Sequence, residues 1–185
     1  MLERLLSIIR HYRFKRYISN LKKRGLKIGN NTHIMDGVFL DPSHCFLISI
    51  GDNCTLAPNV RIMAHDASMK KFIGVTRIGL VRIHNNCFIG DSTLILPGVS
   101  IGPNTVIGAG SVVIRDIPAD SLAAGNPARV IGSIEDFKKK HDDNKNKFRC
   151  FSEEDFNIDI ISEDRKQEMI DYLNQHIAYM KRFSK

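Results

Sequence analysis

The side chain of this sequence that is best suited to acid–base chemistry is His65. It opens the segment HDASMKK, which interrupts an otherwise regular pattern of residues. The unperturbed pKa of an imidazole lies close to neutral pH, so a loop histidine can take a proton from a reacting hydroxyl group. Asp66 follows directly, where its carboxylate either orients the imidazole ring or caps a turn. We therefore take His65 as the candidate general base.

The pattern around His65 is an internal repeat of six residues, with units such as IGDNCT, LAPNVR, IGDSTL, ILPGVS and IGPNTV. The first residue of each unit is Ile, Leu or Val, and the fifth is small or β-branched in almost every unit. Gly, Asn, Asp and Pro lie between them, as tight turns require. A period of six fits neither an amphipathic helix nor a hairpin ladder, but it fits short parallel strands stacked as a solenoid, three to a coil. Cys54 and Cys87 occupy fifth positions, so we expect them to be packing residues.

The repeat is interrupted twice. Ten residues separate Leu40 from Ile50 where six would keep the register, so about four extra residues should protrude there. Twenty-one residues separate Ile62 from Ile83, three more than a full coil of eighteen, and His65 lies at the start of this second break. Insertions in a rigid solenoid are common places for functional residues.

The other histidines give no metal-binding pattern. Three are predicted at helix ends and three at turns of the repeat: His11, His141, His176, His33, His44 and His84. A zinc site on a scaffold of this kind requires a close HxxxxH pair and a third histidine, and no two histidines here are five residues apart. We therefore expect no metal site.

Charge divides the 185 residues into three parts. Residues 1–27 carry nine Lys and Arg against one Glu, residues 28–133 carry seven charges of each sign, and residues 134–185 carry eleven positive charges against twelve negative. The net charge of +7 is therefore an N-terminal feature, and the middle of the chain gives no electrostatic reason to expect nucleic acid. We expect a basic helical arm (1–27), a β-helix domain with a loop at 65–82, and a helical C-terminal extension.

The N-terminal arm is predicted to be a basic amphipathic helix over residues 2–18. Its apolar residues recur at helical spacing among cations: Leu2, Leu5, Leu6, Ile9 and Tyr12. Such a helix either packs on the solenoid or the oligomer, or contacts an anionic membrane surface through residues 1–24.

The C-terminal extension is predicted to contain two helices. Residues 134–150 begin as a helix and pass into the polar linker DDNKNK. A second helix opens at Ser162 and continues to about Phe183. Its apolar face is expected to contain Ile170, Leu173, Ile177 and Met180.

Neither export nor membrane insertion is indicated by the sequence. Uncharged apolar runs stay far below 18 residues, and charges interrupt the apolar segments of the N-terminus. The four cysteines form no CxxC pair, which favours the reducing cytosol and a cytoplasmic protein.

The segment IGDSTLILPGVSIGPNTVIGAGSVVIRDIPADSLAAGNPARVIG (89–132), together with His65-Asp66-x-Ser68, resembles the hexapeptide-repeat acyltransferases. It is most similar to the sugar O-acetyltransferases of the maltose and galactoside type, and the similarity extends over residues 28–132. GAGSVV followed by AAGNPARVI is typical of the acetyl-CoA-dependent group. The resemblance implies a mainly β fold, a left-handed parallel β-helix with helical segments at both ends, and a homotrimer whose active sites lie between subunits.

The resemblance also implies acetyl-CoA as a co-substrate, no permanently bound cofactor, and His65 as the catalytic residue. Since a thioester is already activated, direct transfer to a hydroxyl needs a base but neither a metal nor a protein nucleophile. The implied reaction is O-acetylation of a sugar or glycan hydroxyl, in surface polysaccharide or glycoconjugate synthesis. Two alternatives remain open: acetylation of an antibiotic hydroxyl or an amino sugar, and a non-catalytic β-helix that serves as an assembly module.

Further site residues follow from the match to this family. Asp41, Asp66 and Phe88 are implied for the acceptor, and Asp41 has the alternative role of a turn residue before Pro42. The acetyl-CoA site is implied to contain Asp91, Ala109, Ile114, Arg115 and Arg129. The two arginines would meet the phosphates or the adenine of the donor, and their alternative role is that of solvated turn residues.

Overall fold

Helix α1 (Leu2–Lys23) and the strands that follow it belong to the first of two compact units, Met1–Ile134, and the second unit is Glu135–Lys185. The computed structural model describes residues 2–152 and 161–181. Across these two ranges, no helix has the length and apolar character needed to cross a bilayer.

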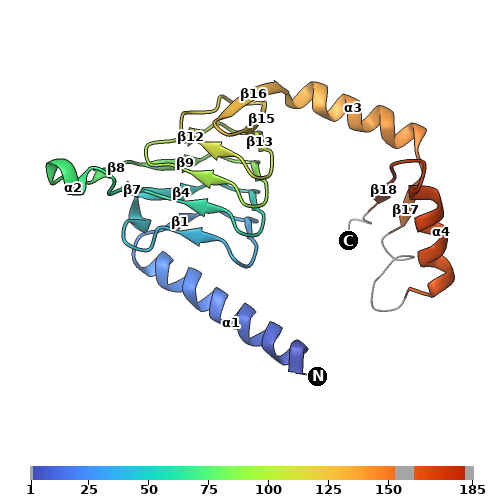
Figure 1. Cartoon of the computed structure of the whole chain (residues 1–185), viewed down its shortest axis with the longest axis horizontal. Coiled ribbons are helices and arrows are strands. Elements are labelled where there is room, and N and C mark those ends of the chain that lie inside the picture. Colours follow the sequence, from blue (N-terminus) through green and yellow to red (C-terminus); the bar gives the residue numbers. More distant parts are fainter. Residues whose placement is uncertain (1, 153–160, 182–185) are drawn as a thin grey trace. The chain divides into compact units, whose positions relative to one another are not determined.

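The first unit is a stack of coils, each of which adds one short strand to each of three sheets (Figure 1). One sheet contains β1 (Lys27–Ile28), β4 (Ile48–Ile50), β9 (Val81–Ile83) and β12 (Ser100–Ile101). The second contains β2 (His33–Ile34), β5 (Thr55–Leu56), β10 (Phe88–Ile89), β13 (Val106–Ile107), β15 (Ser121–Gly125) and β16 (Ala128–Ser133). The third contains β3 (Phe39–Leu40), β6 (Arg61–Ile62), β11 (Leu94–Ile95) and β14 (Val112–Val113). All neighbours in these sheets are parallel except β15 and β16, so the coil of three parallel strands predicted from the six-residue period is confirmed.

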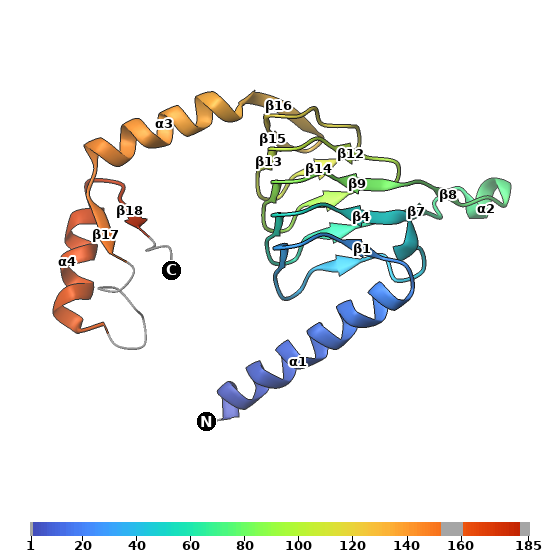
Figure 2. The same ribbon diagram turned by 180° about the vertical axis from the view of Figure 1, so that it is seen from behind.

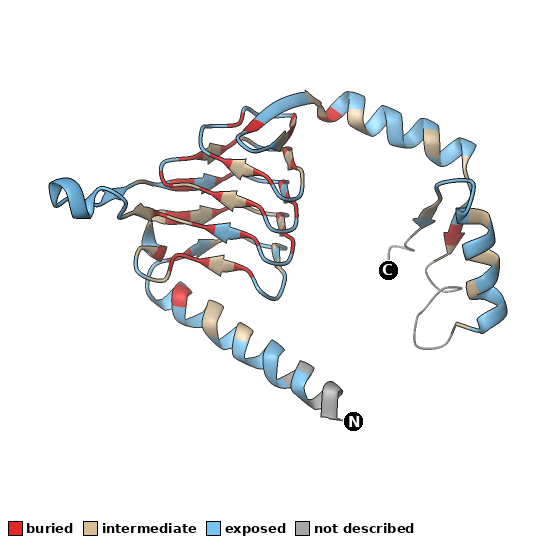
Figure 3. Ribbon diagram, in the orientation of Figure 1, coloured by how far each residue is buried: buried red, intermediate tan, exposed pale blue. Residues whose placement is uncertain are grey.

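The first residues of the repeats belong to one apolar core, or pack against it where they are only partly buried, as Ile28 and Ile34 are. In Figure 3 the buried positions recur from coil to coil along the stack. Ile50, for example, lies opposite Ile28 in one neighbouring coil and Ile83 in the other. Burial of one such side chain is worth about 1.5–3 kcal/mol, so this core is the main source of stability for the solenoid. Cys54 and Cys87 are also buried, as expected for packing residues.

One row of turns carries a ladder of amide side chains along the stack. Its members are Asn31, Asn53, Asn86 and Asn104, all with φ between 50° and 59°. Asn tolerates this left-handed conformation better than most L-residues do. Each side-chain amide donates to the next member at 2.9–3.2 Å, and the last donates to Asp120. The ladder therefore holds successive coils in register at this corner.

Helix α1 covers the first coil with the apolar side chains of its C-terminal half. Leu21 is buried, and Phe14, Tyr17 and Ile18 pack against the core. The stripe predicted to be the apolar face is not the packing face, because Ile9 and Ile18 are nine residues apart and point to opposite sides of a helix. The described members of that stripe are 44–67% exposed, namely Leu6, Ile9 and Tyr12, whereas the side chains of Leu2 and Leu5 lie outside the described residues.

The first insertion folds back onto α1 instead of protruding. It forms a short 3-10 helix, η1 (Cys45–Leu47), in which Cys45 is buried. The thiol of Cys45 donates to the carbonyl of Leu21 at 3.7 Å. The insertion thus lies between the end of α1 and the coil that carries His65.

The second unit contains α3 (Ile134–Lys147), β17 (Cys150–Ser152), α4 (Glu163–Leu173) and β18 (Tyr179–Lys181) (Figure 2). Helix α3 includes the segment that was expected to be a polar linker, where Lys145 and Asp142 form an ion pair at the helical spacing i, i+3. The two strands pair in parallel.

Helix α4 matches only the first half of the predicted second helix. It begins after Ser162, whose Oγ accepts the N–H of Arg165 at 3.4 Å, and it ends at Leu173. The helix does not continue because residues 179–181 pair with β17, which takes Met180 out of the expected apolar face. The expected helix end at Phe183 lies outside the described residues, as do residues 153–160.

Candidate active site

His65 lies at the base of an arm that projects from the stack (Figure 1). The arm is an antiparallel hairpin of β7 (His65–Asp66) and β8 (Arg77–Ile78), with the short helix α2 (Lys70–Ile73) at its tip. The guanidinium of Arg77 donates to the carbonyl of Pro97 at 3.0 Å, which fastens the arm to the neighbouring coil. The second break in the repeat therefore forms a projecting loop, within the predicted range 65–82.

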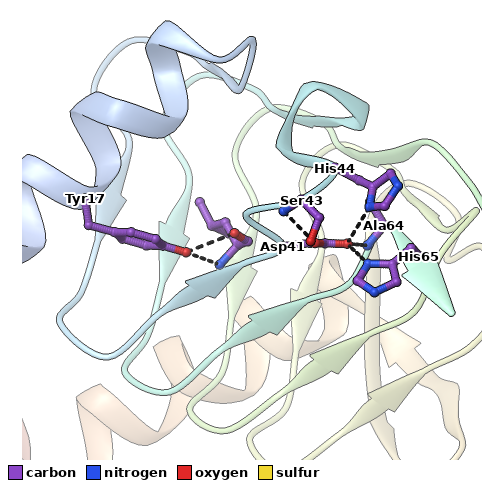
Figure 4. Close-up of polar contacts among 7 residues, drawn as sticks. Tyr17, Asp41, Ser43, His44, Ala64 and His65 are labelled. Atoms are coloured by element: carbon purple, nitrogen blue, oxygen red, sulfur yellow. Dashed lines mark hydrogen bonds and ion pairs between the residues drawn. The ribbon is translucent and has the colours of Figure 1, made fainter. Parts of the chain in front are cut away.

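The coil geometry places Asp41 beside His65. Strand β3 pairs with β6 so that Leu40 lies opposite Ile62, and Asp41 therefore leaves the stack one coil away from the segment that ends at His65. The carboxylate Oδ2 of Asp41 contacts Nδ1 of the His65 ring (Figure 4). The same oxygen accepts the N–H of Ala64, and Oδ1 accepts the N–H of Ser43, each at 3.1 Å.

The environment of Asp41 favours its ionised form. Its side chain is fully buried, and burial alone would raise the pKa of the carboxyl. The hydrogen bonds from His65, Ala64 and Ser43 outweigh burial and hold the pKa of Asp41 below its ordinary value. An ionised carboxylate can only accept, so Nδ1 of His65 must carry the proton of this contact. In the neutral form of a ring held in this way, the other nitrogen, Nε2, has a free lone pair that can accept a proton from a hydroxyl group.

The structure places the two aspartates in different surroundings, and each makes the turn contact that was one of its two expected roles. The carboxylate of Asp41 is enclosed and oriented toward His65 and two backbone N–H groups, one of which, that of Ser43, belongs to the turn at Pro42. Its contact with an acceptor stays a prediction. Asp66 had two expected roles, orienting the ring or capping a turn, and its Oδ1 accepts the N–H of Ser68 at 2.8 Å, which caps the turn of the arm. That hydrogen bond lowers the pKa of Asp66. Asp41, one coil away, contacts the histidine instead.

Two residues near this pair were missed in the sequence. The first is His44, whose ring lies 4.8 Å from the His65 ring between centroids and whose Nδ1 lies 3.8 Å from Oδ2 of Asp41. The ligand atoms of Asp41, His44 and His65 all lie within 4.8 Å of one another, which is a grouping that could hold a metal ion. The search for histidines five residues apart could not find it, because the carboxylate and the insertion are part of the group. The spacing Asp41-x-x-His44 was the available signal.

The second missed residue is Tyr17 of α1. Its hydroxyl donates to the carbonyl of Leu40 at 2.9 Å and accepts the N–H of Leu40 at 3.1 Å (Figure 4). Burial raises the pKa of Tyr17, which keeps the hydroxyl neutral and able to do both. Helix α1 is therefore tied to the residue that directly precedes Asp41.

Four of the expected donor-binding residues are exposed and lie on two corners of the stack. Asp91 and Ala109 are on adjacent coils of one corner, where the N–H of Gly110 donates to the carbonyl of Asp91 at 2.8 Å. Ile114 and Arg115 follow β14, on the same corner as His65 but two coils further along.

The last two expected site residues lie on the second sheet. Arg129 is exposed on β16, and its guanidinium donates to the carbonyl of Ala128 at 2.9 Å. Phe88 is 44% exposed on β10, on a different face of the stack from His65. One chain therefore does not bring all the expected site residues to one place.

Both the sequence and the fold of this chain are similar to those of known proteins. A family model described as bacterial transferase hexapeptide (six repeats) matches residues 81–115. A solved structure of galactoside acetyltransferase in complex with coenzyme A superposes with a TM-score of 0.52 at 32% identity, and covers 68% of this chain and 74% of that one. The chain belongs to the hexapeptide-repeat acetyltransferase family.

Two further members of the hexapeptide-repeat acetyltransferase family show how much of the chain is shared. Galactoside O-acetyltransferase of Escherichia coli (strain K12) is 44% identical over 101 residues, which cover 52% of this chain and 48% of that enzyme. A hexapeptide-repeat-containing acetyltransferase of Vibrio cholerae, complexed with acetyl coenzyme A, has a TM-score of 0.53 at 31% identity and covers 59% of this chain and 60% of that one. The chain spans about half the length of the first curated relatives that it matches.

Proposed function

We propose that this protein is an acetyl-CoA-dependent O-acetyltransferase that transfers the acetyl group directly to a hydroxyl of a sugar. The observation that carries this proposal is the contact between the buried carboxylate of Asp41 and Nδ1 of His65, which leaves Nε2 as a base. Relatives named as galactoside acetyltransferases, one of them solved with coenzyme A, support the sugar and the donor.

In this mechanism Nε2 of His65 takes the proton of the acceptor hydroxyl as its oxygen attacks the carbonyl carbon of the thioester. A tetrahedral intermediate forms, and a backbone N–H would stabilise its oxyanion. The C–S bond then breaks, and the departing thiolate of coenzyme A takes the proton from the imidazolium. Asp41 holds the ring in place and offsets the positive charge that the ring carries between the two proton transfers.

We further propose that the coils are left-handed and that the active unit is a homotrimer with its sites between subunits. The exposed apolar side chains of the arm are an argument for such a trimer, because a partner subunit would bury them. These side chains are 51–75% exposed: Phe72, Ile73, Val75 and Ile78. In such a trimer Asp91, Ala109, Ile114, Arg115 and Arg129 would bind the donor, and Phe88 would contact the acceptor.

The cellular role follows as part of the same proposal. We assign the reaction to surface polysaccharide or glycoconjugate synthesis in the cytoplasm, where the free thiols of the four cysteines persist. Residues 1–24 would bring the enzyme to an anionic membrane surface, since Leu6 and Ile9 are exposed beside Arg10 and Arg13.

The test is thiol release from acetyl-CoA with the full chain, across a panel of sugars, nucleotide sugars, amino sugars and hydroxyl-bearing antibiotics. We expect release that depends on a sugar hydroxyl and that disappears in His65→Ala. If only an antibiotic or an amino sugar supported turnover, the acceptor would belong to that class and not to the sugars acetylated on a hydroxyl. Failure to bind acetyl-CoA by calorimetry would favour a non-catalytic assembly module.

A further inference from the structure

We propose that Asp41, His44 and His65 form a binding site for a divalent transition metal of the zinc class, and that the bound metal disables the base. The three side chains converge at the corner where the first insertion meets the arm (Figure 4). Metal binding needs only the geometry of this cluster, whereas the loss of activity rests on the proposed function.

The observation that points to a ligand is the state of His44. Its Nδ1 atom is buried and makes no hydrogen bond within the described part of the chain. The nitrogen faces the carboxylate of Asp41, but at 3.8 Å it is too far away for a hydrogen bond. A buried polar atom without a partner is costly, and a metal ion between these groups would satisfy it.

The chemistry of the group suits zinc. Two imidazole nitrogens and one carboxylate oxygen are common zinc ligands, and a three-ligand site leaves the fourth position for water. Metal–ligand bonds of about 2.0–2.2 Å place tetrahedral ligand atoms about 3.3 Å apart. The three atoms now lie within 4.8 Å of one another, so modest side-chain rotations are enough.

The surroundings of Asp41 resemble the support that bound metals usually receive. Ligating carboxylates in metal sites are themselves hydrogen-bonded, which fixes their direction. Here the N–H groups of Ser43 and Ala64 hold both carboxylate oxygens. Asp41-x-x-His44 supplies a close pair of ligands, and His65 supplies the distant third.

Occupation of the site would change His65 in a defined way. A metal on Nδ1 replaces the hydrogen bond to Asp41 and places a positive charge next to the ring. Because the metal takes the lone pair of Nδ1, the single proton of the neutral imidazole lies on Nε2, which then has no lone pair left to accept the proton of a hydroxyl group. We therefore expect metal to inhibit the acetyl transfer while leaving the fold and the donor-binding surface intact.

Binding is tested first, without substrates. The full chain, stripped of metal by dialysis against a chelator, is titrated with Co²⁺ and followed by its visible absorption, and Zn²⁺ is then added as a competitor. All proteins carry Cys150→Ser, because Cys150 is an exposed free thiol that could bind metal by itself. We expect one Co²⁺ per chain, displaced by Zn²⁺.

Two His44 variants make this test specific. His44→Ala removes the ligand, and His44→Phe removes it while keeping a ring in the same space; each should weaken binding by at least about 10–100-fold. His33→Ala, which removes an exposed histidine of the first coil, is the matched control and should bind as the parent does. Equal affinity in the parent and in both folded His44 variants would overturn the site.

Inhibition is then measured by thiol release with and without Zn²⁺. We expect inhibition of the parent that a chelator reverses, and a rise of at least about tenfold in the inhibitory Zn²⁺ concentration for both His44 variants. Binding without inhibition in an active enzyme would overturn the regulatory part. If the parent lacks acetyl transfer altogether, the Co²⁺ titration still decides the site, and only the proposed function fails.

Discussion

The corner that holds His65 and the surface that holds the expected donor-binding residues differ in how completely one chain builds them. At the corner, the buried carboxylate of Asp41 accepts hydrogen bonds from two backbone N–H groups and from the imidazole of His65, which fixes the position of both side chains. On the donor surface, the side chains of Asp91, Arg115 and Arg129 are exposed. The contrast teaches that one chain completes the surroundings of His65 but leaves the expected donor-binding residues in the open, where the proposed trimer would have to supply the rest of a donor site.

The sharpest test of the corner is the removal of the base. We expect His65→Ala to lower the turnover number at least about 10²-fold, the usual scale for a lost general base. Thiol release measures the activity, and thermal unfolding should stay cooperative but occur at a lower temperature, because the variant takes one hydrogen-bond partner from the buried carboxylate of Asp41. His84→Ala, at an exposed turn, is the control. A folded His65→Ala protein with normal turnover would remove His65 from the mechanism.

The binding of acetyl-CoA should depend on the positive charges of the expected donor-binding residues. Replacing Arg115 or Arg129 by Ala should weaken the binding of acetyl-CoA by a few-fold to about tenfold, since exposed contacts to phosphate are worth less than buried ones. Binding of a short acetyl-pantetheine analogue, measured by calorimetry, should change much less because it lacks the nucleotide. Equal losses for both donors would mean that the arginines act on the fold.

Mixed oligomers test whether the two regions meet between subunits. His65→Ala and the double variant Arg115→Ala/Arg129→Ala, refolded together, should recover activity at low acetyl-CoA concentration. Random mixing would leave about one quarter of the interfaces with both halves intact. Sedimentation should show a species near three times 20.9 kDa. An active monomer, or no recovery in trimers shown to be mixed, would contradict the shared site.

The smallest expected effect concerns acid stability. The pKa of Asp41 in the folded protein lies below its ordinary value of 3.8, so the ionised carboxylate favours the folded state at pH values above 3.8. That contribution is lost as the pH falls through the folded-state pKa. The difference in free energy of unfolding between the unchanged protein and Asp41→Asn should therefore be constant near neutral pH and shrink below about pH 4. Urea titrations at several pH values measure it, and parallel curves would show that folding does not lower the pKa of Asp41.

The stacked coils could be predicted because the six-residue period of the sequence corresponds directly to one short strand and one turn. A hydrophobic first position in every unit requires a buried column, and the small fifth position of Cys54 and Cys87 requires close packing. The projecting loop at His65 followed from counting residues against a coil of eighteen.

The irregular parts could not be predicted in the same way. Asp41 and His65 are 24 residues apart, and they meet because β3 pairs with β6 and both residues leave the stack at the same corner. The period of six does not state how either side chain turns once it has left the regular strands. His44 belongs to the first insertion, so its direction depends on how η1 packs against α1. The helical spacing in the C-terminal extension correctly predicted the start of α4. It could not predict where α4 ends, because residues 179–181 pair with β17 and that contact depends on a distant segment.

The contact between Tyr17 and Leu40 has a consequence for how the solenoid ends. Strand β3 lies at the edge of its sheet, and an open edge of this kind exposes backbone groups to which another strand can add. The hydroxyl of Tyr17 occupies both the N–H and the carbonyl of Leu40, and the apolar side chains around Leu21 cover the coil beside it. Helix α1 thus prevents solenoids from associating end to end. A chain that lacks it would expose the edge of the first coil, on which another solenoid could stack to form fibres.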